Sequence, residues 1–334
     1  MQKQAIVSEA MLFEPMVLDQ VQMPNRIVFS PFMEHQANRD GTVSPQLMDY
    51  YLNMAREGAG VIIIESAYVA SQGRAHSNQL GISEERHIEG LYRLVKAIQA
   101  EGAVVGLRLS HAGARTSELL AGEQPVGPSV LNFGKDFDVS REFDDGDVEE
   151  IVLFFVHAAE RAEEVEANFI EINGAQQTLL DQCLSTRFNT RDDNYGGTIQ
   201  GRMLLAAEII KAIKARTTSN IPISYLFSIY DKVEEGFTDA DLKGMLRVLT
   251  NAKVSLLHPV SLHVLNKFFD TEDTLAEWIA RCSKLPILLE GNIKSPQILK
   301  EAIGLRRAQL FSLDKALYSR PNWFAFLQKK MSPA

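Results

Sequence analysis

Short, continuous apolar runs recur along the chain, and each is followed by a longer segment whose apolar residues have helical spacing. The runs occupy residues 26–30, 60–65, 103–110, 168–173, 221–227, 254–260, 286–291 and 308–313. They are continuous rather than alternating, as expected of parallel strands that are covered on both faces. We therefore predict a parallel sheet of eight strands.

The segments between these runs predict helices that alternate with the strands. Helical spacing is present at residues 46–56, 84–101, 147–165, 199–216, 239–251, 273–282, 295–303 and 321–330. Ser83 and Thr238 stand where N-caps are expected, and Gly102 stands where a helix should end. Eight strand–helix units predict one α/β domain over residues 1–334, folded as a (β/α)8 TIM barrel. An open doubly wound sheet is the alternative, but no strand is followed by a Gly-x-Gly-x-x-Gly sequence or a P-loop.

One connection is much longer than the others. The segment at about 114–146 reads ARTSELLAGEQPVGPSVLNFGKDFDVSREFDDG, which exceeds the usual length of a loop between a strand and a helix. Long loops of barrels carry binding functions. We expect this segment to cover the mouth of the barrel.

Composition narrows the class of protein. The chain has 334 residues, a formal net charge of −9 and 46% hydrophobic residues, which suits a soluble globular protein. The acidic balance argues against nucleic acid and anionic membrane as partners. Only two cysteines occur, the N-terminal sequence has no basic segment followed by an apolar one, so no signal peptide is expected, and the apolar runs are too short to span a bilayer. These observations predict a cytoplasmic protein with a small-molecule substrate.

Residues at the C-terminal ends of barrel strands face the active site in this architecture. The predicted strand ends place the following residues there: Ser30, Pro31, Phe32, Met33, Glu65, Ser66, Arg108, His111, Asn173, Gln176, Thr178, Leu226, Ser228, Gly291, Asn292, Asp314 and Lys315. A phosphate site between the last two strands is common in such barrels, and Gly291 and Lys315 would serve it.

Five separated motifs resemble the Old Yellow Enzyme family, in particular its bacterial NADH-dependent flavin oxidoreductases. The motifs are PNRIVFSPF (24–32), GAGVIIIESAYVASQGR (58–74), RLSHAGAR (108–115), LSTRFNTRDDNYGGT (184–198) and SRPNWF (319–324). The resemblance runs from about residue 12 to residue 325. It implies a TIM barrel that binds FMN and passes hydride from NAD(P)H to an electron-poor C=C bond or a related acceptor.

The resemblance also assigns roles to the strand ends. Members of this family hold the acceptor's carbonyl oxygen with two polar residues after the fourth strand, and a nearby Tyr gives a proton to the acceptor's α-carbon. This chain has Asn173 and Gln176 at the first two positions and Thr178 at the third, so a neutral amide pair replaces imidazole. His35 occupies a position where relatives carry a Tyr that contacts substrate. We predict Asn173, Gln176, Thr178 and His35 as catalytic residues.

The flavin contacts implied by the resemblance differ as well. Arg108 stands in place of the usual Gln, Leu226 in place of the usual Arg, and Asp314-Lys315 in place of Gly-Arg at the phosphate. A guanidinium from Arg108 could replace the missing cation at the flavin's pyrimidine edge. The predicted cofactor-binding residues are Ser30, Pro31, Phe32, Met33, Ser66, Arg108, Gly291, Asn292, Asp314 and Lys315.

Each of these assignments has a structural alternative. Arg108 could instead pair with Glu65 or Glu171 inside the barrel, and Asn173 and Gln176 could cap loop backbone. His111 and Cys183 are expected to be structural. The remaining histidines do not have metal-ligand spacing, so no metal site is expected.

Three functions remain open from the sequence. The first is an FMN-dependent oxidoreductase. The second is a non-redox enzyme on the same barrel with His35 as acid or base, and the third is a non-catalytic barrel that binds a small molecule or a protein. Homo-oligomers are common among the proteins that the chain resembles, so the resemblance also implies a possible homo-oligomer.

Overall fold

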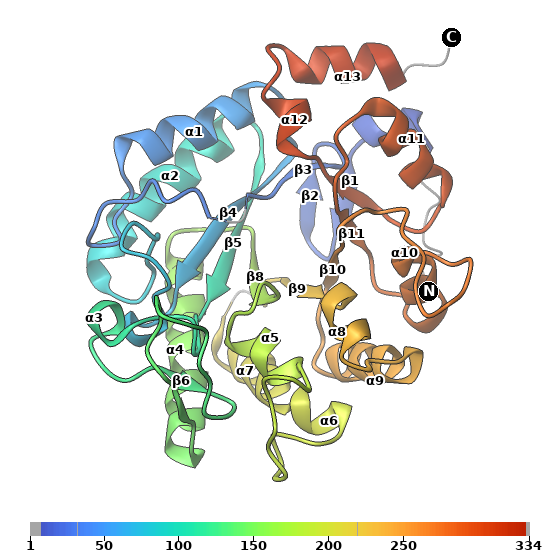
Figure 1. Ribbon diagram of the computed structural model, residues 1–334. Coiled ribbons are helices and arrows are strands. Elements are labelled where there is room, and N and C mark those ends of the chain that lie inside the picture. The colour runs from blue at the N-terminus through green and yellow to red at the C-terminus, as the bar shows by residue number, and fades with distance from the viewer. Residues whose placement is uncertain (1–7, 32, 219, 332–334) are drawn as a thin grey trace.

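The computed structural model describes residues 8–31, 33–218 and 220–331. Eight parallel strands close into a barrel in the order β10-β11-β12-β3-β4-β5-β8-β9 (Figure 1). Their bounds are β3 Ile27–Phe29, β4 Val61–Tyr68, β5 Val104–Ser110, β8 Phe169–Gly174, β9 Ile223–Ser228, β10 Leu256–Val260, β11 Leu288–Glu290 and β12 Leu310–Ser312. Each lies within or beside one of the predicted apolar runs, so the predicted (β/α)8 barrel is confirmed.

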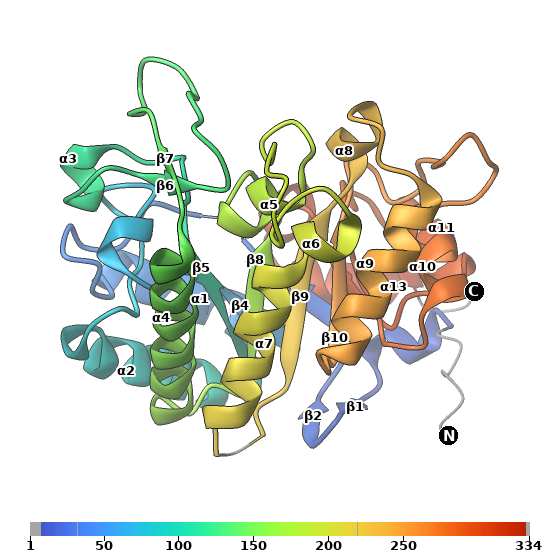
Figure 2. The same ribbon diagram turned by 90° about the horizontal axis from the view of Figure 1, so that it is seen from below.

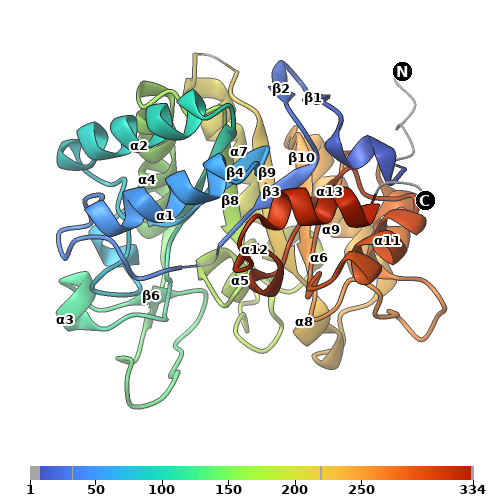
Figure 3. The ribbon, with the colours of Figure 1, turned by 90° about the horizontal axis from the view of Figure 1, so that it is seen from above.

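Helices surround the barrel at the predicted places (Figure 3). Their bounds are α1 Pro45–Arg56, α2 Ile88–Ala100, α4 Asp145–Glu164, α6 Ile199–Arg202, α7 Leu204–Arg216, α9 Asp239–Asn251, α10 Leu275–Cys282, α11 Pro296–Gly304 and α13 Trp323–Met331. The predicted helix at 199–216 is divided into α6 and α7 at Met203.

The two predicted helix N-caps, Thr238 and Ser83, had different outcomes. Thr238 caps α9 with a capping box, in which its hydroxyl accepts the Asp241 N–H at 3.2 Å. The prediction for Ser83 was wrong, because Glu84 caps the short 3₁₀ turn Glu85–His87 that precedes α2, and the Ser83 hydroxyl has no partner. Gly102 follows the end of α2 with φ of 91°, a conformation that glycine adopts without strain.

An antiparallel hairpin that the sequence pattern did not reveal closes the lower end of the barrel. It is formed by β1 Met16–Leu18 and β2 Val21–Met23 (Figure 2). Its buried residues join an apolar cluster inside the barrel, which contains Val28, Val61, Ile63, Val104, Phe169, Leu256, Leu288 and Leu310. Gly106 makes room for this cluster, since a Cβ there would lie 2.2 Å from the Phe169 ring. The lower half of the barrel is therefore a packed, apolar plug.

The C-terminal ends of the strands carry the additional elements. The segment 114–146 holds α3 Glu118–Ala121, β6 Val126–Gly127 and β7 Arg141–Glu142, and it projects beyond the end of the barrel opposite the hairpin (Figure 2). Short helices follow three of the strands: α5 Leu179–Leu184, α8 Tyr230–Glu234 and α12 Lys315–Tyr318. The larger core lies between the strands and the outer helices. Among the described residues, no helix combines the length and apolar character needed to cross a bilayer.

Candidate active site

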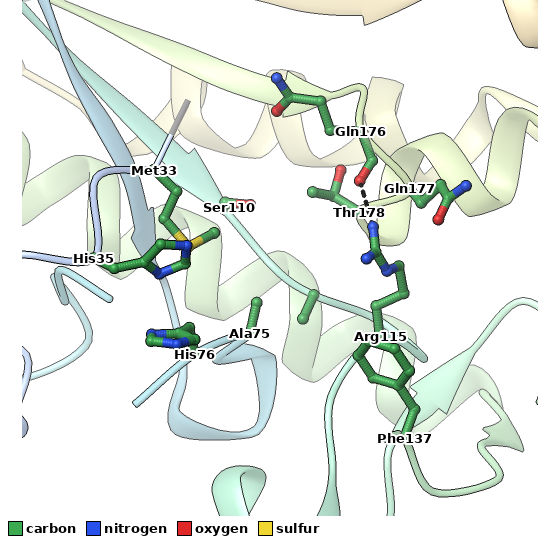
Figure 4. Close-up of a pocket in the computed structure, with 11 residues that line it drawn as sticks. Met33, His35, Ala75, His76, Ser110, Arg115, Phe137, Gln176, Gln177 and Thr178 are labelled. Carbon is green, nitrogen blue, oxygen red and sulfur yellow. Dashed lines mark hydrogen bonds between the residues drawn. The ribbon is translucent and has the colours of Figure 1, made fainter. Parts of the chain in front are cut away.

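Three hollows adjoin one another at the C-terminal ends of the strands. The first has a volume of about 200 Å³ and is lined by Met33, His35, His76, Arg115, Phe137 and Gln176, among others (Figure 4). The second, of about 380 Å³, shares Arg115 and Gln176 with the first. The third, of about 320 Å³, shares Val260 and Ser261 with the second and reaches the ends of β11 and β12. Together they have the size and position of a cofactor-and-substrate site in a TIM barrel.

The loop after β8 is held by its own side chains. Asn173 is 1% exposed, and its Oδ1 accepts the Ala175 N–H at 3.0 Å. The Thr178 hydroxyl donates to the carbonyls of Asn173 at 3.1 Å and Ala175 at 2.8 Å. Asn173 was expected either to meet a ligand or to cap loop backbone, and in the structure it caps the backbone. The hydroxyl hydrogen of Thr178 is likewise directed to the backbone.

Gln176 differs from these two neighbours. Its backbone lies in the left-handed region with φ of 62°, followed by Gln177 with φ of 59°. Two successive non-glycine residues in this region are strained, and such strain clusters at ligand sites. The Gln176 Oε1 atom is buried without a hydrogen-bond partner, and the residue lines both the first and the second hollow. Its amide is thus the group of the predicted pair that stays available to a ligand.

Two histidines face each other in the first hollow. The rings of His35 and His76 have centroids 3.9 Å apart (Figure 4). His35 has a left-handed backbone, with φ of 55°, which places its side chain here. Burial, together with the nearby His35 and Arg74, lowers the pKa of His76. The predicted residue His35 therefore lies at the mouth, paired with a histidine that the sequence pattern did not single out.

Arg108 is enclosed beneath the mouth. Its side chain is buried, with the residue 1% exposed. Its Nε donates a hydrogen bond to Glu171 Oε1 at 2.8 Å. Its Nη1 donates to the Pro31 carbonyl at 2.9 Å, and its Nη2 donates to the Ser30 hydroxyl. Strand register places Arg108 on β5 opposite Glu171 on β8. The structure thus has the ion pair with Glu171, and the expected approach of this guanidinium to a flavin edge would require these bonds to break.

The ion pair continues across the barrel through a histidine. Glu171 Oε2 lies 2.7 Å from His258 Nδ1, and His258 Nε2 lies 3.2 Å from Glu290 Oε2. Burial opposes both charges, yet His258 and Arg108 lower the pKa of Glu171 to about 2, and Glu171 with Glu290 raises the pKa of His258 to about 9. At neutral pH the row Arg108, Glu171, His258 and Glu290 alternates in sign and has no net charge. We call these four residues the barrel charge row.

The other predicted residues take varied places. Ser66 is fully buried and accepts the Asn173 amide at 3.1 Å, whereas Met33 lines the first hollow. Phe32 lies outside the described residues. His111 is 1% exposed with a pKa lowered to about 4 by burial, and burial raises the pKa of Cys183 to about 12, as expected of structural residues. Among the described residues no group of three or more His, Cys, Asp or Glu side chains could hold a metal ion.

Two mouth residues from the long segment were not predicted. Arg115 and Phe137 line the first hollow, with the guanidinium carbon 5.4 Å from the ring centroid. The length of the segment 114–146 indicated a cover, but no spacing rule identifies which of its side chains turn inward. His76 lies two residues after the motif at 58–74, and only its contact with His35 in the structure identifies it as a site residue.

A protein-family model identifies the family to which this barrel belongs. The model for the NADH:flavin oxidoreductase / NADH oxidase family matches residues 11–333. The chain belongs to this family. FMN and NAD(P)H are the cofactors of the family, and the resemblance to the Old Yellow Enzyme group drawn from the motifs is confirmed.

Similar proteins cover most of the chain. It is 34% identical over 310 residues to an NADH oxidase of Thermoanaerobacter brockii, with 90% of this chain but only 48% of that protein covered. It is 30% identical over 315 residues to an NADPH dehydrogenase of Clostridium acetobutylicum, with 93% and 92% covered. The chain therefore spans about half the length of the first relative and nearly all of the second.

Solved structures share the fold. Morphinone reductase in complex with tetrahydroNAD has a TM-score of 0.84 at 21% identity, over 97% of this chain and 92% of that one. An Old Yellow Enzyme homologue from Zymomonas mobilis has a TM-score of 0.82 at 20% identity, over 97% and 94%. At these identities the likeness shows the fold alone.

The third hollow is the part of the mouth that would hold the phosphate of the family's cofactor. Lys315 is the only Lys or Arg that lines it in the described parts of the chain, and Glu34, Glu290 and Asp314 line it too. Two of these carboxylates are engaged: Glu290 with His258, and Asp314 as the N-cap of α12, where it accepts the Ala316 N–H at 2.9 Å. The residues fit FMN, with one ammonium group for its phosphate.

Proposed function

We propose that this protein is an FMN-dependent oxidoreductase that reduces an electron-poor C=C bond, or a related acceptor, with NAD(P)H. The observation that carries the proposal is the set of three adjoining hollows at the strand ends of a barrel of this family. The net reaction adds a hydride from NAD(P)H to one carbon and a proton to the other, and releases NAD(P)+. The bound flavin supplies the hydride transfer between the two substrates.

The third hollow would hold the phosphate and the ribityl chain. Gly291 and Asn292 offer backbone N–H groups, Lys315 offers the cation, and Ser30 and Pro31 form the edge toward the first hollow. Asp314 and Glu34 carry negative charge at the same place, so we propose that FMN is held less tightly than a site with several cations would allow. Arg108, Asn173 and Ser66 do not line this hollow; we propose that Arg108 supports it through its hydrogen bonds to Ser30 and Pro31 rather than by contact with FMN. Thr178 lines the first hollow instead.

The first hollow would hold the acceptor. The Gln176 side chain lines this hollow, so its Nε2 N–H is the proposed hydrogen-bond donor to the acceptor's oxygen, while its buried Oε1 has no partner within the described protein. The proposed proton donor is His35, because its imidazole lines this hollow and carries an N–H group. Thr178 is not proposed for that role, since its hydroxyl donates to two carbonyls. Met33 contributes to the apolar wall.

The test is reconstitution with FMN followed by anaerobic turnover. Protein freed of flavin is titrated with FMN and the binding is measured from flavin fluorescence. We expect one FMN per chain and FMN-dependent oxidation of NADH or NADPH that requires an enone acceptor. Lys315→Gln should weaken FMN binding roughly tenfold, as expected for loss of a charge-assisted hydrogen bond.

Lys300→Gln serves as the matched control, because Lys300 pairs with Glu9 on the surface at 3.0 Å and lies outside the three hollows. A protein that binds no FMN at millimolar concentration would contradict the proposal. Binding that is unchanged in Lys315→Gln would contradict the assignment of the phosphate to the third hollow.

A cytoplasmic location is also proposed, supported by two cysteines that form no disulfide. Homo-oligomer formation stays a prediction, which light scattering of the purified protein would measure.

A further inference from the structure

We propose that the first hollow selects acceptors that carry a carboxylate, and that Arg115 binds this carboxylate. This inference deepens the proposed function, because it names the class of substrate for the same site. It starts from the ionisable side chains that line the hollow and from the bonds that Arg115 leaves unmade.

The first hollow has basic side chains and no acidic ones. The ionisable residues that line it, within the described chain, are His35, His76 and Arg115. Asp or Glu side chains line each of the other two hollows, where Asp181 and Asp231 or Glu34, Glu290 and Asp314 are present. The mouth is therefore divided by charge, and an anionic group gains most in the first hollow.

Arg115 is a cation without a carboxylate partner. Its Nη1 donates to the Gln176 carbonyl at 3.4 Å, and its Nε is buried with no hydrogen-bond partner (Figure 4). No carboxylate of the described residues lies within ion-pair distance of it, which distinguishes it from the fully engaged Arg108. A half-buried guanidinium with a single long hydrogen bond is poorly satisfied, so a carboxylate that reaches its remaining N–H groups gains a strong bond.

The nearest carboxylate that acts on Arg115 is already committed elsewhere. Asp181 lies on α5, and its Oδ1 is 2.9 Å from the buried Lys232 ammonium while its Oδ2 accepts the Gln177 N–H at 2.6 Å. Lys232 also pairs with Asp231 at 2.7 Å. Both oxygens of Asp181 thus have partners of their own, Lys232 and the Gln177 N–H, and neither forms an ion pair with Arg115, which keeps its capacity for an anion from outside.

The remaining walls of the first hollow suit a flat, apolar body. Met33, Ala75, Ala112 and Phe137 contribute carbon surface beside Arg115. The Phe137 ring also supports the guanidinium by a cation–π contact. A volume of about 200 Å³ admits a small unsaturated or aromatic acid. The carboxylate would lie at Arg115, with the acceptor's carbonyl oxygen at the Gln176 amide.

Binding of two matched, unreactive probes tests the inference without turnover. The probes are benzoylpropionate and benzoylpropionamide, which differ in charge but hardly in shape, measured by isothermal titration calorimetry on the protein saturated with FMN. We expect the acid to bind roughly ten- to a hundredfold more tightly than the amide. In Arg115→Gln this preference should disappear while the affinity for the amide stays the same, and Arg115→Lys should restore part of it.

Arg93→Gln is the matched control, because Arg93 lies on the exposed face of α2 and pairs with Glu89. It should keep the full preference. Equal binding of the two probes to the unchanged protein, binding of neither, or a preference that survives in Arg115→Gln would each overturn the inference.

Turnover separates this inference from the proposed function. The unsaturated counterparts, benzoylacrylate and benzoylacrylamide, are compared as acceptors with NADH. NADH oxidation that does not distinguish them supports the proposed function and overturns the inference. Tight binding of benzoylpropionate without any FMN-dependent oxidation of NADH overturns the proposed function and supports the carboxylate site.

Discussion

The barrel charge row and the first hollow use the same kinds of side chain in opposite ways. In the row, Arg108 and His258 each face carboxylates at hydrogen-bond distance, and the four charges cancel. In the hollow, Arg115 has a buried N–H without a partner, and the two histidines face each other.

The comparison shows that residue type does not decide between a structural and a ligand-binding role. A cation that completes a buried pair contributes to folding and is hidden from ligands. A cation that is left without an acid keeps its bonding capacity for a molecule from outside. Substitutions in the row should therefore change stability, and substitutions in the hollow should change binding.

The largest effect is expected when the row is broken at its centre. Glu171→Gln leaves the buried Arg108 and His258 with no full charge between them, so we expect the free energy of unfolding to fall by about 3–5 kcal/mol. Urea denaturation measures it. Glu160→Gln, which removes the surface pair with Arg216, should cost no more than about 1 kcal/mol. Equal losses of unfolding free energy in the two variants would show that the barrel charge row contributes no more to stability than a surface ion pair.

A pH dependence of stability should follow from His258. Its pKa is about 9 in the folded protein against 6.5 for an ordinary histidine, so its stabilising effect is complete below pH 6.5 and is lost as the pH rises through 9. At about 1.4 kcal/mol for each pH unit, the loss is on the order of 3 kcal/mol. Thermal unfolding measured between these pH values should show this decline. The stability of the His258→Gln variant should change less with pH over the same range.

The loop after β8 offers a smaller and sharper contrast between two amides. Asn173→Ala removes the acceptor for the Ala175 N–H, so we expect a loss of about 1–3 kcal/mol in unfolding free energy. Gln176→Ala should change stability by no more than about 0.5 kcal/mol but lower kcat/KM for the acceptor roughly tenfold or more. The reverse assignment of effects would show that Asn173, not Gln176, meets the ligand.

The smallest effect on stability is expected at His35. The side chain is exposed and contacts His76 by its ring alone in the described structure, so His35→Gln should leave the unfolding free energy within about 0.5 kcal/mol of the unchanged protein. The rate of acceptor reduction should fall roughly tenfold or more, as expected for loss of a general acid, measured by anaerobic turnover of the FMN-loaded protein. An unchanged rate would exclude His35 as the proton donor.

Sequence reasoning succeeded where a local pattern carries the information. The continuous apolar runs located all eight barrel strands, because strands covered on both faces cannot alternate in polarity. The hairpin β1–β2 was missed because its strands have three residues each, too few to establish a period. The Ser83 cap was assigned wrongly because Glu84 forms a capping box with His87 one residue later.

The site was harder to derive because its roles depend on contacts between distant segments. Arg108 and Glu171 are 63 residues apart, and only the register between the adjacent strands β5 and β8 places them opposite each other. Asn173 and Gln176 have similar side chains on one short loop, yet one caps the backbone and the other faces the hollow. His76 and Arg115 became candidates only once the fold had placed them beside His35 and Gln176.

The β1–β2 hairpin has a kinetic consequence. Because it and the apolar cluster above it fill the lower half of the barrel, nothing can pass through the barrel axis. Reductant and acceptor must then both arrive and depart at the open end, and we expect them to occupy overlapping space there. Steady-state rates measured at several fixed concentrations of NADH should give parallel double-reciprocal lines, with excess of either reactant blocking its counterpart.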